Sequence, residues 1–307
     1  MNVAKRRKQF KRAPGAQPFA LQDRDVEVLK LVYDLRFAYT QHIVNLVPGS
    51  NEWIKRRLRK LFDEGYLDRP QKQGARAKGK NFSLVYALGA RGAELLKKEH
   101  GLDHIRGDWT KKNREASYLT IQHQLLIAEF RAALVMALKQ NRAGELVFWR
   151  QSHELLDHAL WHGRNGRQQI PVYPDAWFAV KTKAGKTRHF FLEADNSTMR
   201  HERYHKKMTG YFWYWMAGQS AYGRQYGRKK GLFNEADPFR VLTIAKTAVR
   251  TANLFDLAKE MGPKKKPTSM FWFLPATAYD LAEPGRILDE VWKVWTKDGK
   301  TRKMALV

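Results

Sequence analysis

The sequence predicts an α/β protein, α+β overall, that is divided into two domains. Its 307 residues are more than one hydrophobic core usually supports. Short amphipathic helical patterns fill residues 19–99, whereas residues 114–307 alternate helical and strand-like segments, as in a mixed sheet covered by helices. We therefore expect a helical N-terminal domain followed by a mixed-sheet domain.

The charge of the chain indicates an anionic partner. There are 57 Lys and Arg against 30 Asp and Glu, which gives a formal net charge of +27 and favours nucleic acid. The absence of cysteine excludes disulfides, thiolate zinc sites and cysteine nucleophiles. No apolar run approaches the length of a membrane span and the first residues lack a secretion signal, so we expect a soluble, cytoplasmic protein.

Residues 1–18 are the first segment, a run rich in Lys and Arg with no acid, which ends in Pro14, Gly15 and Pro18. This composition is typical of a flexible basic arm. Such an arm either lies along a DNA backbone or remains a solvated tail, and both alternatives stay open.

Three short helices are expected next. Asp23 can cap the first, and the second begins near Thr40 and is broken by Gly49 and Ser50. The third covers residues 51–64, where an apolar stripe at helical spacing leaves five cations for the remaining surface. The stripe consists of Ile54, Leu58, Leu61 and Phe62, and the cations are Lys55, Arg56, Arg57, Arg59 and Lys60.

A β-hairpin with a basic tip follows. Gly65 ends the third helix, and a polar, glycine-rich stretch leads to a returning strand over residues 82–88. The segments IKRRLRKLFDEGYLDR and VYALGARGAELL resemble bacterial winged-helix regulators. In that family the third helix enters the major groove and the wing contacts phosphate or the minor groove, although some winged helices bind protein instead. The DNA contacts that the resemblance implies are Asn51, Lys55, Arg56, Arg59, Arg76, Lys78 and Lys80.

The second domain begins after a charged linker without periodicity at residues 100–113, and its first element is a long helix over residues 114–141. Glu129 on this helix either faces solvent beside Arg131 or reaches a metal in the neighbouring sheet, and His123 is a further candidate. Strands are then expected at residues 146–150, 176–180, 188–194, 239–245 and 270–274, helices at 199–217, 249–261 and 286–295, and loops at 153–167 and 223–231.

Three carboxylates gather in one predicted hairpin. The register expected for strands 176–180 and 188–194 places Asp175 opposite Ala194, while Glu193 and Asp195 share one face of the second strand. Carboxylates that converge in this way repel one another unless a cation lies among them, and such oxygen ligands suit Mg²⁺ or Mn²⁺. We therefore predict a Mg²⁺ or Mn²⁺ site at Asp175, Glu193 and Asp195.

Pro174-Asp175, followed one strand later by Glu193-Ala194-Asp195, resembles the motif of the PD-(D/E)XK nuclease superfamily. The resemblance implies a restriction-endonuclease-like fold over residues 114–307. It also implies that Asp175 and Glu193 bind a divalent ion, which activates water and stabilises charge at the scissile phosphate.

Asp195 occupies the position that a catalytic lysine holds in that superfamily. Two replacements are open: Asp195 serves as a third metal ligand, or a cation from the next helix takes the role of the lysine. For the second, Lys206 is assigned the catalytic role, with Lys207 and Arg200 as alternatives. The other interpretation of Asp195 is a helix cap that accepts backbone N–H groups.

The predicted winged helix followed by PDAWF and FFLEADNST resembles the replication-relaxation family of bacterial plasmid and mobile-element proteins, over most of the chain. The resemblance implies a DNA-binding protein that acts in replication, mobilisation or DNA processing. Its expected partners are double-stranded DNA and plasmid replication or mobilisation proteins. Two activities stay open: a Mg²⁺- or Mn²⁺-dependent DNA endonuclease or nickase, and a non-catalytic regulator or replication accessory with a retired nuclease domain.

A rival motif begins the helix after this hairpin. His201-Glu202-Arg203-Tyr204-His205 matches H-E-x-x-H, in which two histidines one turn apart hold zinc and the glutamate is a general base. It would make the chain a zinc metalloprotease. The surrounding Arg and Lys residues would repel a cation, so we expect a chance match.

Overall fold

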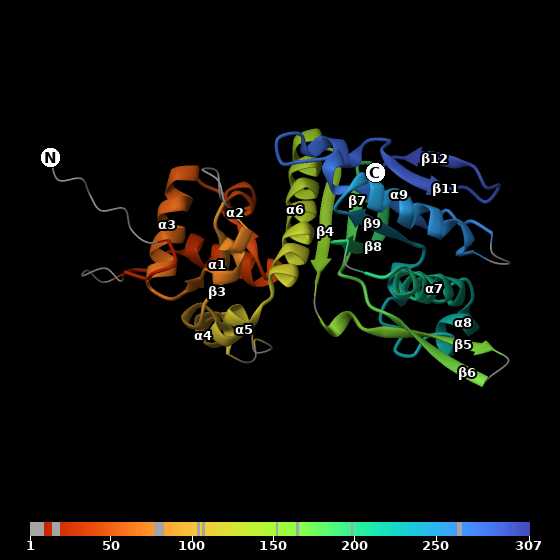
Figure 1. The fold of residues 1–307 in the computed structure, drawn as a ribbon, viewed down its shortest axis with the longest axis horizontal. Coiled ribbons are helices and arrows are strands. Elements are labelled where there is room, and N and C mark those ends of the chain that lie inside the picture. Colours follow the sequence, from red (N-terminus) through yellow and green to blue (C-terminus); the bar gives the residue numbers. More distant parts are fainter. Residues whose placement is uncertain are drawn as a thin grey trace. The chain divides into compact units, whose positions relative to one another are not determined.

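The computed structural model describes residues 9–13, 19–76, 83–102, 105, 108–151, 153–163, 166–197, 199–262 and 266–307. The chain divides into two compact units, Met1–Ala128 and Glu129–Val307, here the N-terminal unit and the C-terminal unit (Figure 1). The division falls inside helix α6 (Tyr118–Asn141). It therefore comes later in the chain than the linker expected at residues 100–113.

The N-terminal unit contains short helices and a small antiparallel sheet, in which β3 pairs with both β1 and β2. Its elements before α6 are α1 (Asp23–Leu35), β1 (Ala38–Tyr39), α2 (Thr40–Leu46), α3 (Asn51–Asp63), β2 (Leu67–Asp68), the 3₁₀ helix η1 (Gln71–Arg76), β3 (Val85–Leu88), α4 (Ala90–Glu99) and α5 (Trp109–Glu115). This order agrees with a winged helix, an assignment that stays a prediction. Lys78 and Lys80 lie outside the described residues.

Helix α3 packs on the N-terminal unit through one face. The Ser50 hydroxyl caps its first turn by accepting a backbone N–H. The inward stripe that the sequence predicts is confirmed, because Ile54, Leu58, Leu61 and Phe62 are all buried. Burial of side chains of this size stabilises a fold by about 1.5–3 kcal/mol each, so the helix is firmly seated.

One cation of α3 lies inside the unit, so the surface position expected for Arg57 is wrong. Its Nε donates to Oδ1 of Asp25 on α1 at 2.8 Å, and its Nη2 donates to the carbonyl of Ala20 at 2.9 Å. Asp25 is fully buried, and a buried carboxylate requires a charged partner. Arg57 therefore ties α3 to α1.

Two segments expected to be flexible or irregular contact the N-terminal unit. Residues 9–13 of the expected arm contact this unit, and the carbonyl of Gln9 accepts a hydrogen bond from Arg69 at 2.5 Å. Helix α5 begins within the expected linker and ends two residues beyond it, and its buried Asn113 donates to the carbonyl of Leu88 at 2.8 Å. The rest of the expected arm, residues 1–8 and 14–18, lies outside the described residues.

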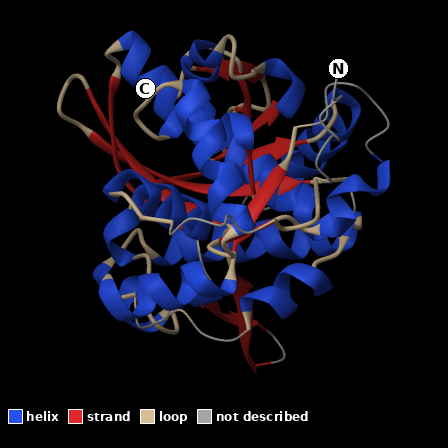
Figure 2. Cartoon of the chain, turned by 90° about the vertical axis from the view of Figure 1, so that its left-hand side faces the viewer, coloured by secondary structure: helices blue, strands red, loops and turns tan. Residues whose placement is uncertain are grey.

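The C-terminal unit is built on a mixed sheet of seven strands within the described residues, in the order β12-β11-β10-β9-β8-β7-β4. Strands β8, β9 and β10 are parallel, and the other neighbours are antiparallel. The strands are β4 (Gly144–Arg150), β7 (Ala176–Thr182), β8 (Thr187–Asp195), β9 (Phe239–Ala245), β10 (Phe271–Pro275), β11 (Trp292–Trp295) and β12 (Thr301–Met304). The mixed α/β class is confirmed, and Figure 2 shows the twist of the strands.

Helices cover both faces of this sheet. Trp177 of β7 belongs to the core beneath α7 (His201–Ala217) and α9 (Ala248–Leu257). The next residue, Phe178, contacts the ring of Phe130 on α6, at 5.9 Å between ring centroids. Because adjacent strand residues point to opposite faces, the sheet lies between these two layers.

Strands β7 and β8 form the hairpin that the sequence predicts. Ala176 pairs with Leu192 and Lys181 with Thr187, so the register extended by one residue places Asp175 beside Glu193. The backbone N–H of Asp175 donates to the carbonyl of Leu192 at 3.0 Å. The register thus differs by one residue from the expected pairing of Asp175 with Ala194.

The prediction of a loop at residues 153–167 is wrong. The segment contributes to two long antiparallel strands, β5 (Asp157–Gly163) and β6 (Gly166–Val172), which form a ribbon beside α7. Gly163 and Gly166, which argue against a helix, suit the turn of a hairpin instead. In the loop expected at 223–231, residues 223–226 belong to α8 (Ala221–Tyr226).

The prediction of a last helix at residues 286–295 is also wrong. A 3₁₀ helix, η7 (Pro284–Leu288), is followed by strand β11. Trp292 and Val294 are buried and Lys293 is exposed, an alternation with the period of two that marks a strand.

Helix α6 is, among the described residues, the one helix long and apolar enough to cross a membrane by length and composition. More than half of its most apolar stretch is buried within the protein. Core helices meet the same test of length and composition.

Candidate functional site

The acid cluster, formed by Asp175, Glu193 and Asp195, lies where β7 begins and β8 ends. Oδ2 of Asp175 accepts the backbone N–H of Ala194 at 2.8 Å, which fixes the aspartate across the hairpin. Glu193 and Asp195 alternate along β8, point to the layer of α7 and α9, and are only 3% and 4% exposed. The hairpin therefore brings the three predicted acids to one end of the sheet.

Two side chains of α7 occupy both oxygens of Glu193. Lys207 donates to Oε2, and the hydroxyl of Tyr211 donates to Oε1. These two residues are four positions apart, so they lie on the same face of the helix. Burial raises the pKa of Glu193 to about 7, although the charge of Lys207 opposes the shift. Burial lowers the pKa of Lys207, but Glu193 and Asp175 together raise it above its ordinary value.

Arg250 of α9 holds Asp195 through two parallel hydrogen bonds. Its Nε donates to Oδ1 at 2.9 Å and its Nη2 donates to Oδ2 at 3.0 Å. Nη2 also donates to the carbonyl of Met199 at 2.6 Å, and the backbone N–H of Ser197 donates to Oδ1 at 2.7 Å. Paired, charge-assisted bonds of this geometry are strong. Arg250 therefore joins α9, β8 and the start of α7.

The raised pKa of Glu193 predicts a pH-dependent stability. Since its pKa is about 7 in the folded chain against an ordinary 4.5, its contribution is fully present below about pH 4.5 and is lost as pH rises through about 7. Relative to Glu193→Gln, we expect the wild-type free energy of unfolding to fall by on the order of 2–3 kcal/mol over this range. Urea unfolding of both proteins at a series of pH values measures the difference in their free energies of unfolding. A difference that instead grows with pH would mean that Lys207 keeps Glu193 ionised in the folded state.

Helix α3 carries the other predicted site. Asn51, Lys55 and Arg56 are exposed, and Arg59 is partly exposed and donates to Asp63 at 2.9 Å. Lys55 pairs with exposed Glu52 at 3.1 Å, whereas Arg56 has no ion-pair partner in the described part of the chain. Arg56 lies on the helix face opposite the buried stripe, Lys55 lies beside the stripe, and Asn51 is exposed in the first turn of the helix. Nothing is described of the side chain of Arg76.

Comparison with known proteins identifies the family. The family model described as replication-relaxation matches residues 29–227, which is more than half of the chain and includes α3 and the acid cluster. The chain belongs to the replication-relaxation family. The family that the sequence predicts is therefore confirmed, and with it a function related to replication or relaxation of plasmid or mobile-element DNA. A search among curated proteins found no match.

The acid cluster of this replication-relaxation protein does not fit a hydrated divalent cation as it is arranged. Lys207 and Tyr211 occupy the oxygens of Glu193, and Arg250 occupies those of Asp195. Among the described residues, no group of three or more His, Asp or Glu side chains could hold a metal ion. The Mg²⁺ or Mn²⁺ expected at the three acids stays a prediction, and it would require these cationic partners to withdraw.

The cation that reaches the acid cluster from α7 is Lys207, whereas Lys206 and Arg200 are exposed. The catalytic role assigned to Lys206 finds no support in this placement, because its neighbour makes the contact. His201, Glu202 and His205 of the H-E-x-x-H motif are also exposed on α7. No third ligand joins them among the described residues.

The remaining candidates are placed on other elements. His123 and Glu129 are partly buried on α6, and the charge of Glu129 adds to the burial that raises the pKa of Tyr279. None of these side chains contacts the acid cluster in the described hydrogen bonds.

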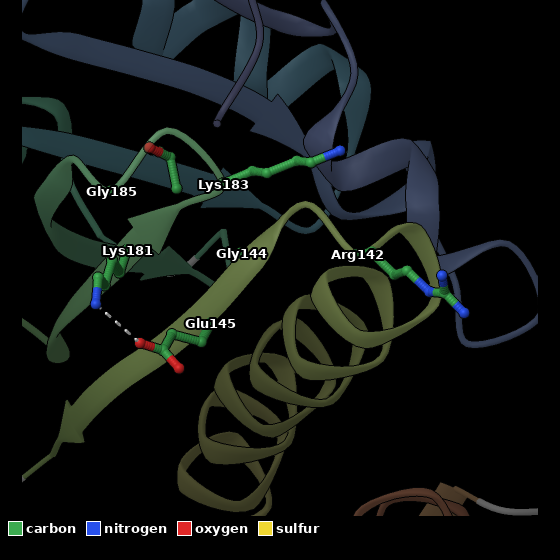
Figure 3. Close-up of a pocket in the computed structure, with 7 residues that line it drawn as sticks. Arg142, Gly144, Glu145, Lys181, Lys183 and Gly185 are labelled. Carbon is green, nitrogen blue, oxygen red and sulfur yellow. Dashed lines mark ion pairs between the residues drawn. The ribbon is translucent and has the colours of Figure 1, made fainter.

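An open pocket whose lining includes several charged residues lies at the far end of the β7–β8 hairpin (Figure 3). Glu145 and Lys181 face each other across its wall at 3.8 Å, and Arg142 and Lys183 extend from neighbouring loops. The pocket adjoins Thr182, whereas Asp175 precedes the other end of β7, about 20 Å away at the usual rise per residue. It is therefore not part of the acid cluster.

Sequence reasoning missed Tyr211 and Arg250. In the sequence, Tyr211 is one of several aromatic residues in a helix, which is typical of a core position. Its hydroxyl donates to Glu193 only because α7 crosses the end of β8. Arg250 follows β9, and the parallel pairing of β9 with β8 brings it to Asp195. The chain offers no local signal for either contact.

Proposed function

We propose that this chain is a double-stranded DNA-binding protein that acts in replication or relaxation of plasmid or mobile-element DNA, and that its N-terminal unit is a winged helix. The observation that carries the proposal is the outer face of α3, the accessible surface that Asn51, Lys55 and Arg56 form while the apolar stripe of the helix is buried. A helix seated in this way presents one surface to a groove.

The seating of α3 supports this role. Arg57 is bound to Asp25 inside the unit, and the apolar stripe packs into the core. The helix is therefore held in one orientation, with the side chains of its outer face in solvent. The pair of Lys55 and Glu52 is exposed and contributes little to stability, so Lys55 can exchange Glu52 for phosphate at small cost. The net charge of +27 adds a long-range attraction to DNA.

We propose that the acid cluster maintains the C-terminal unit and does not hydrolyse DNA. Each acid oxygen of Glu193 and Asp195 has a donor from α7 or α9, and both residues are almost fully buried. Metal-dependent hydrolysis requires an open coordination position for water. This arrangement favours a nuclease-like domain that is retained as a scaffold.

The experiment is a gel assay of supercoiled plasmid with the whole protein, in EDTA and with Mn²⁺ or Mg²⁺. We expect the plasmid to be retarded under all three conditions and to remain supercoiled after the protein is removed. Binding should weaken steeply with salt, because each neutralised phosphate releases counterions.

Metal-dependent nicking would contradict the scaffold role if Asp175→Ala and Glu193→Ala abolished it while binding survived. The chain would then be an endonuclease. A lack of DNA binding at low salt would contradict the whole proposal.

A further inference from the structure

Helix α8 carries two tyrosines that face solvent. Tyr222 and Tyr226 are 73% and 49% exposed, and their ring centroids are 4.6 Å apart. Tyr211 and Tyr214 on the neighbouring helix α7, by contrast, are fully buried. The two rings are tilted against each other, and an exposed aromatic pair of this kind is a surface that a partner can cover.

The chain around this pair is positively charged. From Arg203 to Asn234 there is no Asp or Glu. Of the Lys and Arg residues in this stretch, Lys207 pairs with Glu193 and Arg228 with Asp237. The others, all of them at least partly exposed, are Arg203, Lys206, Arg224, Lys229 and Lys230. Lys229 and Lys230 are exposed, and their ammonium groups donate at 3.0 Å to neutral oxygens, those of the Gln169 side chain and the Leu156 carbonyl. No carboxylate neutralises these two charges among the described residues.

The β5–β6 ribbon extends the same surface. Leu160 of β5 donates to the carbonyl of Gly227 at 2.8 Å, and the backbone N–H of Lys229 donates to the carbonyl of His158 at 3.0 Å. Figure 1 shows α8 next to β5 and β6. Residues 158–174 contain no acid, and Asp157, which precedes them, is buried and accepts from Tyr214. The ribbon, whose sequence contains no acid after Asp157, therefore continues the surface that carries Lys229, Lys230 and the two tyrosines.

We propose that α8 and the β5–β6 ribbon bind single-stranded DNA, with bases stacked on Tyr222 and Tyr226 and phosphates beside Lys229 and Lys230. Stacking on an exposed ring requires an unpaired base, because the bases of a duplex already cover one another. Aromatic rings combined with a positively charged groove are the usual elements of single-strand binding. This site is on a different unit from α3 and takes a different form of DNA, so it goes beyond the proposed function.

Fluorescence anisotropy with labelled oligo-dT, which cannot form a duplex with itself, tests the proposal on the whole protein. We expect Tyr222→Ala/Tyr226→Ala to weaken binding at least about tenfold, because each stacked base contributes roughly 1–3 kcal/mol. Tyr222→Phe/Tyr226→Phe keeps both rings and should bind within about twofold of the wild type. Lys229→Ala/Lys230→Ala should reduce the dependence of the affinity on salt.

The proposal is overturned if the alanine variant binds oligo-dT like the wild type, or if the phenylalanine variant loses binding to the same extent. It is also overturned if duplex DNA alone loses affinity in the alanine variant. The test is separate from the proposed function, because oligo-dT binding can be measured whether or not α3 binds duplex DNA. Variants of α3 should leave oligo-dT binding unchanged.

Discussion

Replacement of Arg250 by Met is expected to lower the free energy of unfolding by about 3–5 kcal/mol, the range for removing one partner of a buried ion pair. Asp195 is almost fully buried, and Arg250 supplies the cation that is bound to both of its oxygens. The substitution leaves a carboxylate without its counter-charge and removes a donor to the carbonyl of Met199. Urea unfolding of the two proteins measures the difference.

The control for this experiment is Arg286→Met in the same unit. Arg286 pairs with Glu283 at 3.0 Å, but both side chains are more than 60% exposed, so the loss should stay below about 1 kcal/mol. The double variant Asp195→Asn/Arg250→Met should recover part of the stability, since it removes the uncompensated charge. Equal losses in Arg250→Met and Arg286→Met would show that Arg250 does not stabilise the acid cluster.

The hairpin of the acid cluster could be predicted from the sequence because its signals are local. Apolar β-formers flank a glycine turn, and the alternation along β8 places Glu193 and Asp195 on one face. The register is off by one residue, because the turn between Thr182 and Lys186 closes one position differently from the one assumed. Strand β9 was predicted with its observed bounds, as a continuous apolar run of its length indicates.

The partners of the acids could not be predicted, because they depend on which strands are neighbours. Arg250 is 55 residues from Asp195 along the chain, and it reaches the aspartate only through the parallel pairing of β8 and β9. Lys206 and Lys207 are adjacent on one helix, and the angle of α7 on the sheet decides which of them faces Glu193. The sequence limits the choice to Lys206, Lys207 and Arg200 and cannot go further.

Two of the errors in secondary structure, both of them missed strands, have a common cause. At residues 153–167 the glycines led to the prediction of a loop, and at residues 286–295 a helix-like composition led to the prediction of a helix. In both segments the strand signal is an alternation of only a few residues. Short alternations are weak evidence until a neighbouring strand or helix covers one face. In the chain, α7 covers the β5–β6 ribbon and β10 pairs with β11.

The central claim is that the outer face of α3 binds duplex DNA. Lys55→Ala/Arg56→Ala removes two exposed cations from this face, and Lys97→Ala/Lys98→Ala removes two exposed cations from α4 in the same unit. The two variants have the same net charge, so their long-range attraction to DNA is equal. Any difference in affinity between them reports contact by α3.

The affinity of both variants for duplex DNA, measured across a range of salt concentrations, tests this claim most directly. For the α3 variant we predict a loss of about 1–3 kcal/mol, roughly tenfold or more, and a salt slope reduced by about 1 for each phosphate contact removed. The α4 variant should stay close to the wild type. Equal affinities and equal slopes for the two variants would contradict the account, because DNA would then respond to the net charge of the chain and not to α3.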